Sequence, residues 1–102
     1  MILKRTLSGL AALAAILTAA PAAAQETPVA IGISGWTGFA PLTLAKEAGL
    51  FKKLGLDVSI KKIPQKDRHL AIASGDIQCA ATTVETWIVW IANGVATTQI
   101  FQ

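Results

Sequence analysis

The chain has 102 residues, the length of one small domain, and 53% of them are hydrophobic. Its formal net charge is +3, but Lys4 and Arg5 lie in a leading segment without acidic residues, so residues 25–102 carry only +1. This balance argues against nucleic-acid or membrane-surface binding. The single cysteine, Cys79, excludes an internal disulfide.

Residues 1–24 have the pattern of a cleavable export signal. Lys4 and Arg5 precede an apolar run over residues 10–20, and the segment ends in the small-residue stretch Pro-Ala-Ala-Ala. The apolar run is shorter than the ~20 residues of a transmembrane helix. We therefore predict cleavage after Ala24, a periplasmic location, and a mature part, 25–102, that is not embedded in the membrane. An uncleaved anchor is the alternative.

The first half of the mature part alternates between strand and helix patterns. Residues 29–34 form a short apolar run between turn-forming residues, which predicts a buried strand. A helical pattern runs from Pro41 to Gly49, and residues 50–54 add one more turn. Residues 56–63 mix apolar and charged residues and are predicted to form a second strand.

The second half continues the alternation. Asp67 is placed to cap a short helix that Gly75 ends, and residues 77–81 predict a third, buried strand. Residues 95–101 predict the start of a fourth strand.

A further helix is predicted between the third and fourth strands. Thr82 and Glu85 fit a capping box, and Gly94 ends the helix. Four apolar residues at helical spacing predict its core-facing stripe: Val84, Trp87, Ile88 and Ile91. Trp90 lies outside this stripe, and its environment stays open.

The remaining chemistry-bearing residues predict no catalytic, metal or cofactor site. His69, the only histidine, lies in a charged stretch and is expected to be a solvated helix residue. Cys79 is expected to be a small core residue. Neither residue has neighbours with metal-ligand spacing.

Alternating strands and helices predict an α/β fold with parallel βαβ units and right-handed crossovers. In such sheets, ligands bind beyond the carboxyl ends of the strands, near helix N-termini. The loops over residues 34–39 and 81–85 fall there. Residues 63–68 form a third, more highly charged loop at the same edge.

Two stretches resemble a known family: "IGISGWTGFAPLTLAKEAGLFKKLGLDVSI" and "LAIASGDIQCAATTVETW". Their order is similar to that in periplasmic substrate-binding proteins of ABC importers for nitrate, taurine and aliphatic sulfonates, with thiamine-precursor-binding relatives. The resemblance implies a periplasmic binding protein type II-like fold of two lobes, of which residues 25–102 would be the truncated N-terminal part of the first lobe. It also implies capture of a small anionic or zwitterionic solute for a membrane permease, without a reaction.

The predicted ligand-binding residues come from the two polar loops. They are Ser34, Gly35, Trp36, Thr37, Thr82, Thr83 and Glu85. Gly35 and Gly38 permit close approach, and Trp36 between them offers a flat ring and an indole N–H. The threonine hydroxyls and nearby free amides suit an oxyanion, and Glu85 suits a cationic group of a zwitterion. Plain packing of Trp36, and capping roles alone for Thr82 and Glu85, are the alternatives.

Other functions are weighed against solute binding. A dinucleotide site is disfavoured because Gly32, Gly35 and Gly38 give G-x-x-G-x-x-G rather than G-x-G-x-x-G. An enzyme on the same architecture, related to pyrimidine (thiamine precursor) synthesis, is a second hypothesis, although no nucleophile and base are in evident register. An inactive truncated product is the third.

Overall fold

The computed structural model describes residues 24–102. The predicted export signal, residues 1–24, therefore lies outside the described residues except for Ala24, and its cleavage stays a prediction. Seven main elements follow along the chain: β1 (Thr27–Ile33), α1 (Ala40–Glu47), α2 (Leu50–Lys53), β2 (Leu56–Lys62), α3 (Arg68–Ser74), β3 (Cys79–Ala80) and α4 (Val84–Ala92). Single 3₁₀ turns at Thr37–Phe39 and Gln65–Asp67 precede α1 and α3.

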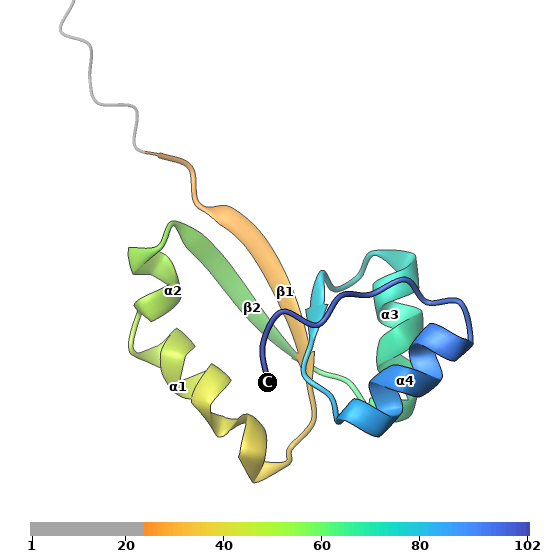
Figure 1. Cartoon of the computed structure of the whole chain (residues 1–102). Helices are drawn as coiled ribbons and strands as arrows, with labels where there is room; N and C mark the ends of the chain where they lie inside the picture. The colour runs from red at the N-terminus through yellow and green to blue at the C-terminus, as the bar shows by residue number, and fades with distance from the viewer. Residues whose placement is uncertain (1–23) are drawn as a thin grey trace, which may run out of the picture.

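The three strands form one parallel sheet in the order β2-β1-β3. β1 pairs with β2 along its whole length, from Thr27 opposite Leu56 to Ile33 opposite Lys62. It pairs with β3 only at Ile31 and Gly32. The helices α1 and α2 lie on one side of the sheet, and α3 and α4 lie on the other (Figure 1). The predicted α/β class with parallel βαβ units is thereby confirmed.

The core lies at the carboxyl end of β1, where the strand is buried on both faces, as expected of a central parallel strand. On one face, Ile31 and Ile33 pack with Phe39 and Val58. On the other, a Cβ added to Gly32 would lie 2.7 Å from Cδ1 of Ile77. The absence of a side chain at Gly32 is what lets Ile77 approach the strand.

The predicted boundaries of the first three strands and two helices hold to within a few residues. Gly49 ends α1 and Gly75 ends α3, both with the positive φ that glycine tolerates, 70° and 82°. The side chain of Asp67 makes no capping hydrogen bond, although the residue occupies the predicted position. β3 is shorter than predicted, and the Ile77 amide donates to the Ala71 carbonyl of α3 instead of joining the sheet.

The predictions for α4 need two corrections. The helix begins at Val84 with Thr83 as the flanking residue, and no side chain caps it, so the capping box was wrong. The predicted stripe was also wrong: Ile88 is 58% exposed, whereas Trp90 is 4% exposed. Residues 87–92 are all apolar, so their spacing does not distinguish one face of the helix from another.

The buried Trp90 of α4 lies beside His69 of α3. The Trp90 ring lies 6.3 Å from the His69 ring, measured between centroids. His69 is therefore half-buried, which corrects the expectation of a solvated residue. Trp87 is only half-buried and donates from Nε1 to Thr97 Oγ1 at 2.9 Å. Cys79 packs against the core, as predicted.

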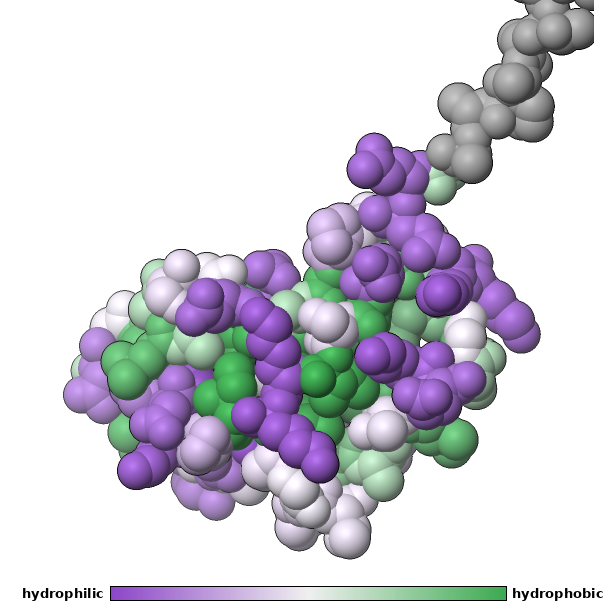
Figure 2. All heavy atoms as spheres, turned by 180° about the vertical axis from the view of Figure 1, so that it is seen from behind, coloured by the Kyte–Doolittle hydropathy of each residue, from purple (hydrophilic) through white to green (hydrophobic). Residues whose placement is uncertain are grey.

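Residues 95–102 form no strand, which corrects the predicted fourth strand. The segment returns to α4 instead, since the Val95 amide donates to the Trp90 carbonyl at 3.0 Å. Ile100 and Phe101 are exposed, and hydrophobic side chains also reach the surface on the face seen from behind in Figure 2. No helix within residues 24–102 has the length and apolar character needed to cross a membrane.

Candidate functional site

The loop after β1 presents Trp36 at the surface. Its side chain is 61% exposed, and its ring meets the Phe39 ring edge to face, with centroids 5.0 Å apart. A Cβ added to Gly38 would collide with the six-membered ring of Trp36, whereas one added to Gly35 would meet no atom within 4 Å. Gly38, and not Gly35, is therefore the glycine that the Trp36 ring requires.

An open hollow of about 340 Å³ lies at this loop. Its lining consists of Ile33, Ser34, Gly35, Trp36, Thr37, Phe39, Ala40, Thr43 and Lys62. Four of the seven predicted ligand-binding residues, those of the first loop, thus share one hollow. Sequence reasoning missed Lys62 and Thr43. The register of the sheet accounts for Lys62, which pairs with Ile33 immediately before the loop.

The three predicted residues after β3 do not line this hollow. The hydroxyl of Thr83 is already engaged: it accepts from Gln65 Nε2 and donates to Thr86 Oγ1, both at 3.0 Å. Gln65 also donates to Thr86. Glu85 is exposed. This network ties the loop after β2 to the loop after β3.

Thr82 differs from its neighbours. Its Oγ1 is buried and has no hydrogen-bond partner among the described residues. It follows Ala81 directly, at the point where β3 leaves the sheet. A buried hydroxyl without a partner costs free energy, so this residue is not explained by packing alone.

Arg68 lies at the carboxyl edge of the sheet and is fully buried, with 0% exposure. Nε donates to the Ile63 carbonyl at 2.9 Å, and Nη1 donates to the Ala81 carbonyl. The guanidinium carbon lies 5.5 Å from the centroid of the Phe39 ring. Burial lowers the pKa of Arg68 below its ordinary value, but a guanidinium stays protonated at neutral pH.

The third guanidinium nitrogen of Arg68, Nη2, is buried and has no partner among the described residues. No ion pair to Arg68 occurs within residues 24–102. A buried cation without an anion is costly, which makes this arginine unusual. It is the only arginine in residues 25–102, a signal that could have drawn attention to it in the sequence.

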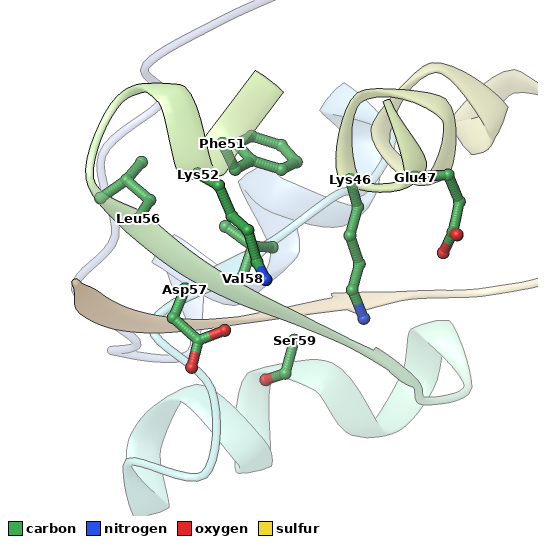
Figure 3. Close-up of a pocket in the computed structure, with 8 residues that line it drawn as sticks. All are labelled: Lys46, Glu47, Phe51, Lys52, Leu56, Asp57, Val58 and Ser59. Atoms are coloured by element: carbon green, nitrogen blue, oxygen red, sulfur yellow. The ribbon is translucent and has the colours of Figure 1, made fainter. Parts of the chain in front are cut away.

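A second hollow, of about 330 Å³, lies between the α1–α2 region and β2 (Figure 3). Charged side chains of both signs line it, with Lys46 and Lys52 on the helices and Asp57 on the strand. It is placed at the beginning of β2, away from the carboxyl edge where α/β sheets bind ligands. We therefore favour the hollow at Trp36. Within the described residues, no three His, Cys, Asp or Glu side chains are grouped to hold a metal.

Comparison with known proteins decides the family. A sequence model described as "NMT1/THI5 like" matches residues 36–102, about two thirds of the chain. The chain belongs to the NMT1/THI5-like family. This confirms the resemblance to the superfamily of nitrate-, sulfonate- and taurine-type substrate-binding proteins and thiamine-precursor binders. The parallel sheet is consistent with part of a type II periplasmic-binding-like lobe. No curated protein and no solved structure matches the chain.

Membership of the NMT1/THI5-like family supports a solute-binding protein or a related fold. The matched segment begins at Trp36 and includes Lys62, Arg68 and Thr82. The exposed tryptophan, the lysine beside it and the buried arginine thus all lie within the part of the chain that defines the family match.

Proposed function

We propose that this protein captures a small anionic or zwitterionic solute, of the nitrate, sulfonate or taurine class, in the hollow at the carboxyl end of β1. It delivers the solute to the membrane permease of an ABC importer. Export through residues 1–24 into the periplasm belongs to the same proposal. The observation that carries it is the lining of the hollow around the exposed Trp36 ring.

The lining suits a small polar anion. Trp36 and Phe39 provide apolar walls, and hydroxyls come from three residues, Ser34, Thr37 and Thr43. Lys62 supplies a positive charge, and no carboxylate is among the described residues that line the hollow. A volume of about 340 Å³ is at the small end of ligand sites, which span ~300–1,000 Å³.

Binding is favoured over catalysis by the positions of the reactive side chains. The only histidine, His69, packs beside Trp90, and the only cysteine, Cys79, lies in β3. Neither residue lines the hollow. The THI5 members of the family are related to pyrimidine synthesis, so the pyrimidine-forming enzyme stays the alternative.

Tryptophan fluorescence tests the proposal. Nitrate, taurine and methanesulfonate are titrated into the purified protein, and at least one should change the emission. The change should disappear in Trp36→Phe and persist in Trp87→Phe, because Trp87 does not line the hollow. A response that survives in Trp36→Phe, or no response to any solute, would contradict the proposed site.

Lys62 offers a matched comparison. Lys62→Gln should weaken binding of the anion about two- to fivefold, the effect expected of an exposed charge. Lys53→Gln removes the same charge from α2 at an exposed position that lines neither hollow, and should leave the affinity unchanged. Equal effects of both substitutions would mean that only net charge matters.

A further inference from the structure

Arg68 has one hydrogen-bonding group more than its structural role uses. Nε and Nη1 hold the carbonyls of Ile63 and Ala81, which follow β2 and β3 on the two sides of β1. These two bonds account for a clamp at the carboxyl edge of the sheet. Nη2 adds nothing to that clamp, yet it is buried without a partner in the described part of the chain.

Thr82 adds a second free group at the same edge. The carbonyl that Nη1 contacts belongs to Ala81, so the Thr82 hydroxyl follows the guanidinium contact by one residue of chain. Its Oγ1 is buried and, within residues 24–102, also has no partner. Two unsatisfied buried groups, one of them cationic, thus lie at the carboxyl edge of the sheet, where parallel sheets bind ligands.

We propose that Arg68 and Thr82 form a buried oxyanion subsite that holds the anionic group of the solute, an inference that rests on the function proposed above. A guanidinium N–H and a hydroxyl both donate, and charge-assisted bonds from arginine suit the oxygens of a sulfonate or carboxylate. The anion neutralises the cation and satisfies both groups. Trp36 and the hydroxyls of the hollow then contact the rest of the solute.

Phe39 contacts both the open hollow and Arg68. Its side chain lines the hollow, and its ring faces the guanidinium at 5.5 Å. Trp36 meets the same ring edge to face. Access of the anion to Arg68 requires Phe39 to move from its place in the core, which costs packing against Ile31 and Ile33 and exchanges a cation–π contact for charge-assisted hydrogen bonds.

Thr82→Val provides the decisive variant because it removes the hydroxyl and keeps the shape. Loss of an unsatisfied buried hydroxyl should leave Tm unchanged or raise it. Methanesulfonate should bind about tenfold more weakly, as expected for one lost hydrogen bond to a charged group. Thr98→Val, at an exposed position, is the control and should bind as the unmodified protein does. Arg68→Lys keeps the positive charge but loses the planar guanidinium with its several N–H donors. It should weaken binding of methanesulfonate at least as much as Thr82→Val does.

Dimethyl sulfone, a neutral analogue of methanesulfonate, tests the charge requirement at constant ionic strength. It should bind at least tenfold more weakly than the sulfonate to the unmodified protein, and Thr82→Val should weaken its binding less than it weakens that of the sulfonate, because a hydrogen bond to a neutral oxygen is the weaker one. Equal sulfonate affinity in Thr82→Val and the unmodified protein would overturn the subsite, as would no sulfonate binding or equal binding of sulfone and sulfonate. A lower Tm in Thr82→Val would also overturn it, by showing that the hydroxyl has a partner within the protein.

The two proposals fail separately. If a solute changes Trp36 fluorescence while Thr82→Val and Arg68→Lys bind it normally, the hollow is the site and the subsite is wrong. If no solute of the panel affects Trp36, the proposed function itself is wrong.

Discussion

Gly38 and Gly35 flank Trp36 and allow a matched test of how the tryptophan is held. Neither glycine has a positive φ, so alanine fits the backbone at both positions. A new Cβ at position 38 would collide with the Trp36 ring, while one at position 35 would meet no atom within 4 Å. The two substitutions therefore differ in one respect: only the one at position 38 displaces the indole ring of Trp36.

The expected magnitudes follow from the contacts of Trp36. Gly38→Ala displaces the ring and breaks its edge-to-face contact with Phe39, a loss of about 1 kcal/mol in the free energy of unfolding. Further loss is small, because 61% of the side chain is already exposed. Gly35→Ala should stabilise the fold by about 0.5 kcal/mol by restricting the unfolded chain. The two variants should differ by about 1.5 kcal/mol, or roughly 6–12 °C in Tm.

Thermal unfolding followed by circular dichroism measures the difference, and tryptophan emission reports the ring itself. Gly38→Ala should shift the emission and abolish the solute response, whereas Gly35→Ala should retain both. Equal Tm values for the two variants, or an unchanged emission spectrum in Gly38→Ala, would refute the argument that the absence of a side chain at Gly38 leaves room for the Trp36 ring.

Two further predictions concern the core and the leading segment. Gly32→Ala should destabilise the fold by about 1–3 kcal/mol through overpacking against Ile77, and Ile77→Val, which removes the clashing Cδ1, should recover part of that loss in the double variant. Chemical denaturation of all three variants measures the coupling, and additive effects would count against the contact. Intact mass of the protein recovered from the periplasm should correspond to residues 25–102, and a product that retains residues 1–24 would contradict the predicted cleavage.

The parts of the fold predicted well from the sequence depend on local patterns. β1 and β2 were visible as short apolar or alternating runs, and the helix ends at Gly49 and Gly75 were visible because left-handed backbone favours glycine. The face of α4 was not predictable in this way. Its apolar run from Trp87 to Ala92 gives no preferred side, and tertiary contacts such as that with His69 on α3 decide that Trp90 is buried.

In the candidate site, too, the residues predicted from the sequence are those set by local pattern, and the residue that was missed depends on tertiary contacts. The first loop was predicted because its residues are consecutive, and Ser34, Trp36 and Thr37 do share a hollow. Arg68 was missed as an individual residue because arginine is ordinarily exposed. Its burial depends on carbonyls of Ile63 and Ala81 that only the folded sheet brings together. Long-range pairing of this kind leaves little trace in local spacing.

β1 is held very unequally on its two sides. β2 accompanies it along its full length, whereas β3 joins it at only two residue pairs. Cooperative opening at low free-energy cost is therefore expected on the β3 side first, with β1, β2 and the Trp36 loop still folded. Thr82 belongs to the side that opens, and Arg68 bridges it to the side that stays. An anion held by these two residues would link the halves, so that part of its binding free energy appears as slower amide exchange in β3 and α4.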